Sequence, residues 1–260
     1  MTIIYKANSI YQAIQVGERS GVRYMRFGEE GSGWQGALAI EQPERLYFPY
    51  QQAFALHVAW LPTVQNFLAI GVGTGTAIRH IHRRHREAHV TGIDLDEQVI
   101  EVAARFFGLP TDQRCRYFAE DGLKYLDRID DVFDLIFIDV FFHEQTPTSF
   151  FSEAFIDKIR RHLAPEGIVA MNVIMTTAGP KQHHFWNLYT LLAQIIGPTY
   201  YVALGPLPFI SQNIILFAHN QTETSLLLTD LRKNCMREID KGKRYFAPYA
   251  KILPWRLKQK

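Results

Sequence analysis

The sequence predicts an α/β fold in which a doubly wound, mostly parallel sheet follows a small N-terminal β unit. Three observations support this prediction. Short β-type segments, separated by polar and glycine-rich breaks, fill the first forty residues. From about residue 62 onward, apolar strand-like runs alternate with helical patterns, and parallel strands need such crossovers between them. An apolar run at 67–70 leads into alternating glycines and then a helix, an arrangement by which such folds bind ligands.

The N-terminal segment is expected to form a small antiparallel meander. β-type segments occur at 11–16, 22–27 and 34–40. Apolar and aromatic residues at helical spacing predict one helix over 47–60, and Pro62 ends it. Because the composition changes there, we expect two units: residues 1–62, the meander with its linking helix, and residues 63–260, a Rossmann-like unit that binds the ligand.

The second unit is predicted from the regular alternation of strands and helices, which we take in chain order. Strands are expected at 67–70, 90–93, 116–118, 133–139, 168–173, 200–204 and 213–218, with helices at 76–86, 97–107, 123–126, 152–163 and 182–196. The tail from Glu223 is mixed, and its basic end, residues 251–260, predicts a solvated helix and a frayed terminus.

The composition is that of an ordinary globular chain. Lys and Arg number 28 against 26 Asp and Glu, a net charge of +2, with 47% hydrophobic residues. This excludes a disordered chain, a collagen-like chain and an electrostatically driven nucleic-acid binder. Two cysteines, Cys115 and Cys235, are too few for a disulfide framework or a four-thiolate zinc site. We expect both to be inert buried thiols, and we expect no metal.

No membrane span is expected. The stretch 185–222 contains no Asp, Glu, Lys or Arg, but its Gly-Pro pairs divide it into pieces shorter than the roughly 20 residues that a bilayer requires. No charged-then-apolar leader opens the sequence. A cytoplasmic location is therefore the expectation.

The glycine loop is the most informative segment. Gly71, Gly73 and Gly75 follow the apolar run directly, and glycines there let a ligand approach peptide N–H groups at a helix N-terminus. A dinucleotide-binding loop would have its third glycine where Thr76 stands, so nicotinamide binding is disfavoured. The alternative is a tight strand-to-helix turn with no ligand.

Acidic residues follow the strands that neighbour this loop. Asp94 ends the next strand, where doubly wound folds grip a ribose diol; its alternative role is a helix N-cap. Asp121 follows the third strand, where a side chain in the Glu120-Asp121-Gly122 segment could accept a hydrogen bond from an adenine amino group. Asp139 ends the fourth strand at the same edge. An adenosine-containing ligand is the inference.

Together these residues resemble the spermidine synthase family, aminopropyltransferases built on the methyltransferase-type Rossmann fold. The likeness runs from about residue 11 to about residue 217. It includes Tyr11-Gln12, Tyr50-Gln51, the glycine loop, Asp94-Leu95-Asp96, Glu120-Asp121-Gly122, the strand at 133–139 and the run from Phe150 to Phe155. In that family the N-terminal β unit helps to build a dimer, so the resemblance implies a homodimer.

The resemblance also implies a reaction. Decarboxylated S-adenosylmethionine, or S-adenosylmethionine, would give an aminopropyl or related group to a small-molecule amine acceptor, as in polyamine biosynthesis. The displacement occurs at a carbon next to a sulfonium, so the protein must hold an unprotonated amine in line. By position, Gln12 and Gln51 would contact the thioadenosine ligand, Asp94 would hold the ribose, Asp121 would read the adenine, and Tyr50 and Asp139 would flank the amine. The alternative for Asp139 is a loop cap.

Three positions depart from the family pattern. Thr74 stands where the family usually has an aspartate that binds the donor ammonium. Phe142 stands where the family has a second carboxylate that binds the diamine, and Phe209 replaces a tyrosine. Charge-assisted contacts are worth about 1.5–3 kcal/mol each, so putrescine is disfavoured as a substrate. Glu144 in the following loop could substitute for the lost carboxylate.

These departures leave two alternatives to an aminopropyltransferase. One is an S-adenosylmethionine-dependent methyltransferase, although ordinary methyltransferases usually have an acidic residue just before the glycine loop, where Ala69 and Ile70 stand here. The other is a catalytically inactive relative that binds an adenosyl ligand.

Several basic residues and histidines have simpler interpretations. The basic run 79–86 is expected to be a solvated helix face rather than a metal or phosphate site. His57 is expected to be a core or pocket-wall residue. Adjacent helix positions point in different directions, so of His183 and His184, which could line the pocket mouth, one is expected to be exposed.

Overall fold

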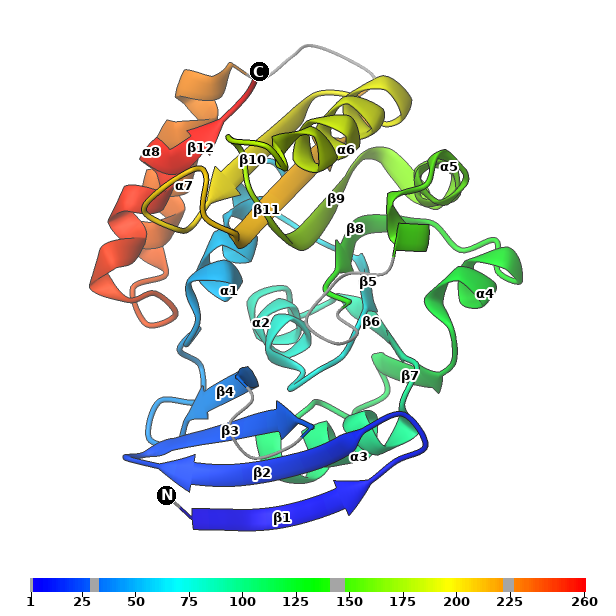
Figure 1. Ribbon diagram of the computed structural model, residues 1–260, viewed down its shortest axis with the longest axis vertical. Helices are drawn as coiled ribbons and strands as arrows, with labels where there is room; N and C mark the ends of the chain where they lie inside the picture. Colours follow the sequence, from blue (N-terminus) through cyan, green and yellow to red (C-terminus); the bar gives the residue numbers. More distant parts are fainter. Residues whose placement is uncertain (1, 29–32, 141–147, 222–226) are drawn as a thin grey trace.

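The computed structural model describes residues 2–28, 33–140, 148–221 and 227–260, which form two β-sheets (Figure 1). A four-stranded sheet comes from the N-terminal segment and an eight-stranded sheet from the remainder. The larger sheet is mostly parallel and has helices on both faces. The predicted fold class is therefore confirmed.

The small sheet is antiparallel, with the strands in chain order. Ser20 and Gly21, with φ of 50° and 76°, close a two-residue hairpin between the second and third strands, which suits the right-handed twist of such a pair. The sequence prediction missed the first strand, because its side chains are all exposed or only partly buried. The strands are β1 (Thr2–Asn8), β2 (Ala13–Arg19), β3 (Val22–Phe27) and β4 (Trp34–Ala39).

The large sheet has the strand order β12-β10-β11-β9-β8-β5-β6-β7. From β9 to β7 the neighbouring strands are parallel, whereas β11, β10 and β12 continue the sheet by antiparallel pairing. Its strands are β5 (Asn66–Ile70), β6 (His89–Asp94), β7 (Cys115–Ala119), β8 (Phe133–Ile138), β9 (Leu163–Met175), β10 (Thr199–Ala203), β11 (Gln212–His219) and β12 (Leu257–Lys258).

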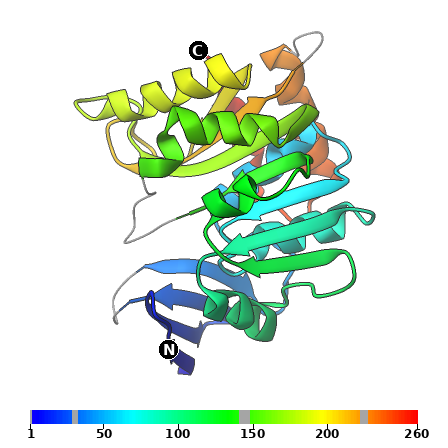
Figure 2. The same cartoon turned by 90° about the vertical axis from the view of Figure 1, so that its right-hand side faces the viewer.

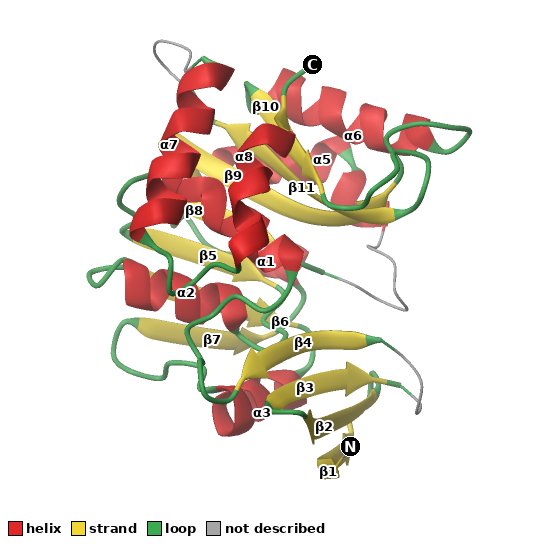
Figure 3. Cartoon of the chain, turned by 90° about the vertical axis from the view of Figure 1, so that its left-hand side faces the viewer, coloured by secondary structure: helices red, strands yellow, loops and turns green. Residues whose placement is uncertain are grey.

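Helices cover both faces of this sheet. One face carries α1 (Pro49–Phe54), the 3-10 helix η1 (Ala55–Ala59), α2 (Thr76–Arg84), α7 (Leu228–Lys241), the 3-10 helix η3 (Pro248–Ile252) and α8 (Leu253–Arg256) (Figure 3). The other carries α4 (Gly122–Asp127), the 3-10 helix η2 (Thr148–Phe151), α5 (Glu153–Arg161) and α6 (Gln182–Ile195) (Figure 2). On β5, Phe67 faces the first group and Leu68 the second, which explains why central parallel strands are apolar without interruption.

The helix α3 (Glu97–Phe107) joins the two sheets. The Arg23 guanidinium donates to the Phe106 carbonyl at 2.7 Å, and the Ser9 hydroxyl donates to Asp96 at 2.6 Å. The division of the chain at residue 62 stays a prediction. A shared apolar cluster contains Ile14, Val16, Met25 and Leu38 of the small sheet and Val99, Val102 and Phe107 of α3.

The linking helix is divided and packs with the large sheet. The sequence predicted one helix over 47–60, whereas α1 passes into η1 at Ala55. The Phe54 ring stacks on Phe137 of β8 with ring centroids 4.1 Å apart. This packing places α1 beside the carboxyl end of β8.

The expectation of a solvated basic face on α2 was wrong for part of the run. Arg79, His80 and His85 are buried, at 5%, 4% and 7% exposure. His80 lies edge-on to Tyr245 of the C-terminal segment, with ring centroids 5.2 Å apart, and His85 lies beside His57 of η1. The Arg79 guanidinium donates to the Phe107 carbonyl at the end of α3. Periodicity within one helix does not reveal such cover.

The expectation of a solvated, frayed tail was also wrong. Leu253 and Leu257 are buried, and β12 pairs with β10 at the edge of the sheet. The Arg256 guanidinium donates to the carbonyls of Ala203 and Gly205. In the described ranges, none of the helices has the length and apolar character needed to span a bilayer.

Candidate active site

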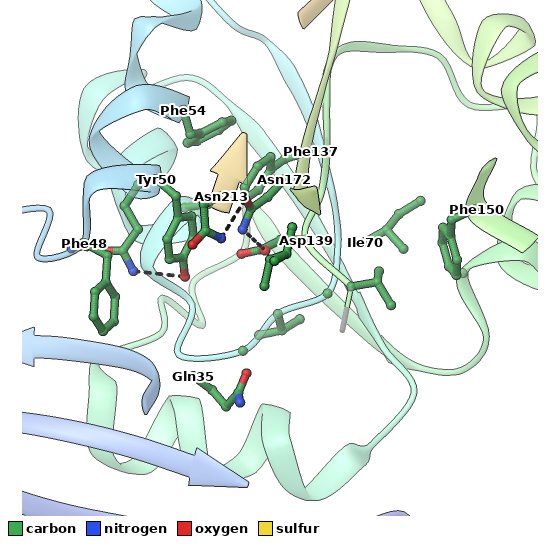
Figure 4. Close-up of a pocket in the computed structure, with 18 of the residues that line it drawn as sticks. Gln35, Phe48, Tyr50, Phe54, Ile70, Phe137, Asp139, Phe150, Asn172 and Asn213 are labelled. Atoms are coloured by element: carbon green, nitrogen blue, oxygen red, sulfur yellow. Dashed lines mark hydrogen bonds between the residues drawn. The ribbon is translucent and has the colours of Figure 1, made fainter. Parts of the chain in front are cut away.

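Most of the predicted site residues surround a large cavity of about 1640 Å³ at the carboxyl ends of the parallel strands. Figure 4 labels Tyr50 and Asp139 among them. Loops after β5, β6, β7 and β8 supply one part of its wall. Further parts come from the segment before β2 and from β4, α1, α2, η2, β9, α6 and β11. The predicted residues that line it are Gln12, Tyr50, Gln51, Gly71, Gly73, Asp94, Asp121 and Asp139.

The glycine loop adopts backbone conformations that require glycine. Gly71 has φ of +94°, and a Cβ there would lie 2.3 Å from the Asp139 carbonyl oxygen. Gly73 has φ of +52°, and a Cβ there would meet no atom within 4 Å. Gly71 is therefore needed for close packing of two strand ends, whereas Gly73 keeps open space beside the cavity.

Gly75 differs from the other two glycines. It is absent from the described residues that line the cavity, and a Cβ there would lie 2.4 Å from Leu109 Cδ1. It has φ of +68° and precedes the first turn of α2. The structure therefore places Gly75 in packing behind the loop, not beside the other predicted residues.

Asp94 anchors the glycine loop. Its Oδ2 accepts hydrogen bonds from the backbone N–H groups of Val72 at 2.9 Å and Gly73 at 3.4 Å, and its Oδ1 accepts from that of Asp96. Burial raises the pKa of Asp94, and the backbone donors oppose that shift. The alternative of an N-cap was wrong, because Asp96 caps α3 by accepting from the Gln98 N–H. One carboxylate lone pair of Asp94 still remains for a ribose hydroxyl.

Asp121 lies at the next strand end and caps α4. Its Oδ1 accepts from the Leu123 N–H at 2.7 Å, so its second oxygen remains available toward the cavity. The neighbouring Glu120 instead pairs with the Arg128 guanidinium. Of these two acids, Asp121 is thus the better placed to accept from an adenine amino group.

Asp139 belongs to a network that the sequence prediction missed. The Asn172 amide donates to Asp139 Oδ1 at 2.9 Å, and the Asn213 amide donates to Asn172 Oδ1 at 3.1 Å (Figure 4). Asn172 is 2% exposed, and a polar residue inside the apolar run of β9 was the signal that could have revealed it. Burial raises the pKa of Asp139 to about 6, against the opposing effect of the Asn172 hydrogen bond.

Tyr50 and Gln51 approach this carboxylate from α1. The Gln51 amide donates to the Tyr50 hydroxyl at 3.4 Å, and Gln51 Oε1 accepts from the Phe48 N–H. Burial, followed by the nearby charge of Asp139, raises the pKa of Tyr50. Tyr50 therefore stays a neutral phenol that donates or accepts a hydrogen bond, and Asp139 is the group able to take a proton near neutral pH.

The positions that depart from the family pattern have different surroundings. Thr74 lines the cavity and is 4% exposed. Phe209 is 61% exposed and is absent from the described lining residues, and its match to the family tyrosine stays a prediction. Phe142 and Glu144 lie outside the described residues.

The histidines noted in the sequence fall into two groups. His57 is fully buried, which confirms the core interpretation. His183 and His184 are both exposed, and His184 lines the cavity. Of the cysteines, Cys235 is fully buried and burial raises its pKa to about 12, whereas Cys115 is only partly buried.

A possible group of metal ligands lies elsewhere. Among the described residues, His82, Asp112 and Cys115 bring their ligand atoms within 4.8 Å of one another. The hydrogen bond with His82 lowers the pKa of Asp112 to about 2, and Arg114 also pairs with Asp112 at 3.2 Å. Because a guanidinium already neutralises this carboxylate, we assign no metal to the cluster.

Comparison with known sequences gives a family match over most of the chain. The Spermine/spermidine synthase domain matches residues 48–230. The polyamine aminopropyltransferases of Vibrio vulnificus and Chromobacterium violaceum are 25% and 28% identical over 181 and 160 residues, covering 68% and 61% of this chain. The matches span 60% of the length of each of these relatives. A Bos taurus eEF1A lysine and N-terminal methyltransferase is 26% identical over 132 residues, 46% of this chain and 19% of that protein.

Comparison with solved structures supports the fold. A probable spermidine synthase from Corynebacterium glutamicum has a TM-score of 0.79 at 19% identity, over 92% of this chain and 88% of that one. The human methyltransferase-like protein 13 in complex with SAH has a TM-score of 0.65 at 19% identity, over 75% of this chain and 92% of that one. The methyltransferase-type Rossmann fold is thus shared by both neighbours.

Proposed function

Because the chain belongs to the spermine/spermidine synthase family, we propose that it is a transferase that binds an adenosyl sulfonium and alkylates an amine. The donor is decarboxylated S-adenosylmethionine, and the transferred group is aminopropyl or a related group. The observation that carries the proposal is the position of Asp139. Its half-buried carboxylate lines the same cavity as the glycine loop, and its pKa is raised to about 6.

The donor is proposed to lie along the ends of β5, β6 and β7. Asp94 would accept from the ribose and Asp121 from the adenine amino group, while Gln12 and Gln51 would contact the thioadenosine. The open space beside Gly73 supports close approach of the ligand to the loop. The backbone donors of this loop are held in place by the Asp94 carboxylate.

The reaction is proposed to be a direct displacement. The amine lone pair forms a bond to the carbon attached to the sulfonium, the carbon–sulfur bond breaks, and its electron pair leaves on sulfur as a neutral thioether. The amine loses one proton. Asp139 would hold the ammonium before reaction and receive the proton, and the neutral Tyr50 hydroxyl would orient the nitrogen lone pair. Alignment and proton transfer are the two tasks that the protein performs here.

Methyl transfer from S-adenosylmethionine is the second candidate. It is favoured by Thr74, a neutral residue that lines the cavity where the family usually has a carboxylate for the donor ammonium. The likeness to a protein methyltransferase also supports it. A relative that binds the adenosyl ligand without turnover is the third.

Calorimetric titration tests these proposals. Methylthioadenosine, S-adenosylmethionine and its decarboxylated form are titrated into the protein, and we expect methylthioadenosine to bind with a micromolar dissociation constant. Tighter binding of the decarboxylated donor supports aminopropyl transfer, whereas tighter binding of S-adenosylmethionine supports methyl transfer. Absence of binding by all three at millimolar concentration would contradict an adenosyl-binding function.

A homodimer and a cytoplasmic location also belong to the proposal. The first rests on the presence of the small N-terminal sheet, and light scattering after size exclusion tests it. The second is consistent with the two free cysteines and is tested by cell fractionation.

A further inference from the structure

The cavity changes its charge along the large sheet. Acidic side chains lie at the ends of β7, β6 and β8, among them Asp121, Asp94 and Asp139, in the direction in which the strand order runs toward β9 and β11. Glu120 and Asp96 line the same part of the cavity. Beyond Asp139, the described lining residues include no carboxylate. Their ionisable side chains are Lys181 and His184, both exposed.

The far end of the cavity combines apolar side chains with neutral polar ones and with Lys181 and His184. It is formed by the end of β9, the start of β11 and the inner side of α6. Its described apolar residues are Phe150, Phe151, Ile174, Met175, Leu188, Leu191 and Leu204. The described residues of this surface give no counterion to a second ammonium, and Lys181 adds a positive charge that disfavours it.

The amides near Asp139 can accept hydrogen bonds from a cation, but they carry no negative charge to pair with it. Asn172 Oδ1 already accepts from Asn213, and the Asn172 amide nitrogen already donates to Asp139. An ammonium carries three donors and no acceptor. Of the two amides, Asn213 therefore offers the one carbonyl oxygen that does not take part in these two bonds.

We propose that the acceptor is a monoamine: its single ammonium binds at Asp139, and its uncharged body lies over β9 and β11. This inference rests on the proposed function and specifies the acceptor for that same site. Neighbouring strands lie about 4.8 Å apart, so a short diamine held at Asp139 would extend its second ammonium over these two strands. There it would lose hydration without gaining a carboxylate from the part of the chain that the structure describes.

The test compares two amines of nearly equal shape. n-Pentylamine and putrescine differ mainly in that a methyl group replaces the second ammonium. Each is titrated into the protein at pH 8, with and without saturating methylthioadenosine. We expect n-pentylamine to bind at least about tenfold more tightly, the scale of one unpaired charge. Equal or tighter binding of putrescine would overturn the proposal.

Two variants test where the ammonium groups of these amines bind. Asp139→Asn should weaken n-pentylamine about tenfold or more, and an unchanged affinity would also overturn the proposal. Asn213→Asp adds a carboxylate of the same shape over β11, and should shift the affinity ratio toward putrescine by about tenfold. Melting temperature and methylthioadenosine binding report whether each variant is folded.

The experiment distinguishes failure of the proposed function from failure of the monoamine proposal. If methylthioadenosine does not bind, the proposed function fails, and the amine ranking is read from the titrations without it. If methylthioadenosine binds and putrescine is preferred, the function stands and the monoamine acceptor is wrong.

Discussion

At the scale of single residues, the chemistry of the cavity depends on Asp139 and on the groups that hold it. Its carboxylate is half-buried, with the Asn172 amide as its hydrogen-bond partner among the described residues. Of those residues, none donates a backbone N–H to this side chain, so the described structure gives no support to a role as loop cap.

Asp139→Asn should therefore affect turnover more than stability. Loss of a positioned base lowers turnover on the order of a hundredfold, while the affinity for methylthioadenosine is kept. The melting temperature should not fall, because the variant removes a carboxylate whose ionised form is opposed by burial. Turnover and melting temperature are measured on the same sample once an acceptor is known. An unaltered rate with a lowered melting temperature would show that Asp139 is structural.

Asn172→Ala should raise the pKa of Asp139 above its value of about 6, because the Asn172 hydrogen bond opposes the effect of burial. The shift is measured without any acceptor, by following the Asp139 carboxyl carbon with ¹³C NMR during a pH titration. The acid limb of the pH–rate profile should move to higher pH in parallel.

Asn213→Ala is the matched control for that experiment. It removes the bond to Asn172 Oδ1 and leaves the donor to Asp139 in place, so its effect on the titration should be smaller. Identical titration curves for Asn172→Ala and the unmodified protein would contradict a positioning role for Asn172.

At the scale of elements, two glycines of the loop have different roles: Gly71 is needed for packing, and Gly73 leaves room for the ligand. Gly71→Ala forces a Cβ against the backbone carbonyl of Asp139 and should cost several kcal/mol of stability, roughly the upper range of single substitutions. Gly73→Ala meets no neighbouring atom and should cost about 1 kcal/mol for its left-handed conformation. Urea unfolding measures both.

The same pair of variants tests ligand approach. Gly73→Ala places a methyl group beside the cavity and should weaken methylthioadenosine about tenfold or more, although it is the milder change for stability. If Gly73→Ala binds methylthioadenosine as well as the unmodified protein does, the ligand does not contact this part of the loop.

The contact of α2 with η1 holds three neutral histidines. His57 Nδ1 donates to the Phe54 carbonyl, His85 Nδ1 accepts from the Val64 N–H, and the two Nε2 atoms lie 3.4 Å apart. This pattern is satisfied when His85 donates and His57 accepts, both rings being neutral. Burial lowers the pKa of His80 to about 3 and that of His85 to about 4, and it also lowers that of His57.

Acid should therefore destabilise the fold in a defined pH window. The unfolded chain binds protons at the ordinary histidine pKa of about 6.5, whereas the folded chain does not until lower pH. Stability is thus complete above pH 6.5 and falls as the pH drops toward 4. At pH 5 the loss is on the order of 2 kcal/mol for each of His80 and His85.

His80→Phe tests this dependence. Among the described residues the His80 ring nitrogens have no hydrogen-bond partner, so phenylalanine keeps the aromatic contact and removes the titration. The difference between urea unfolding free energies at pH 7 and pH 5 should shrink by about 2 kcal/mol. Exposed His89→Gln is the control and should leave that difference unchanged. An undiminished pH effect in His80→Phe would contradict the assignment.

At the scale of the whole molecule, the small sheet and the large sheet are expected to unfold together. The apolar cluster on α3 draws on both, so Val102→Ala should lower the free energy of unfolding by about 2 kcal/mol and shift a single transition. Val132→Ala, at a position 50% exposed, is the control and should change it by less than about 0.5 kcal/mol. If calorimetry shows two separate unfolding transitions, the two sheets unfold as independent units.

The sequence by itself determined the fold class, the alternation of strands and helices, and the glycine loop with its following acids. Each of these is a local signal: apolar runs that need cover on both faces, glycines where the backbone has positive φ, and carboxylates at the ends of parallel strands. Eight of the nine predicted site residues line one cavity. These local signals account for Gly71, Gly73, Asp94, Asp121 and Asp139, whereas the family resemblance implied Gln12, Tyr50 and Gln51.

Only the tertiary structure decided which partners these residues have. Asn172 donates to Asp139 and Asn213 donates to Asn172, each from a strand distant in sequence. The Asp94 carboxylate holds the glycine loop. Gly75, His80 and the C-terminal strand took surroundings that their own segments did not predict, because burial there comes from elements packed against them. Periodicity within one segment records which face is apolar, but not which distant polar group or helix covers it.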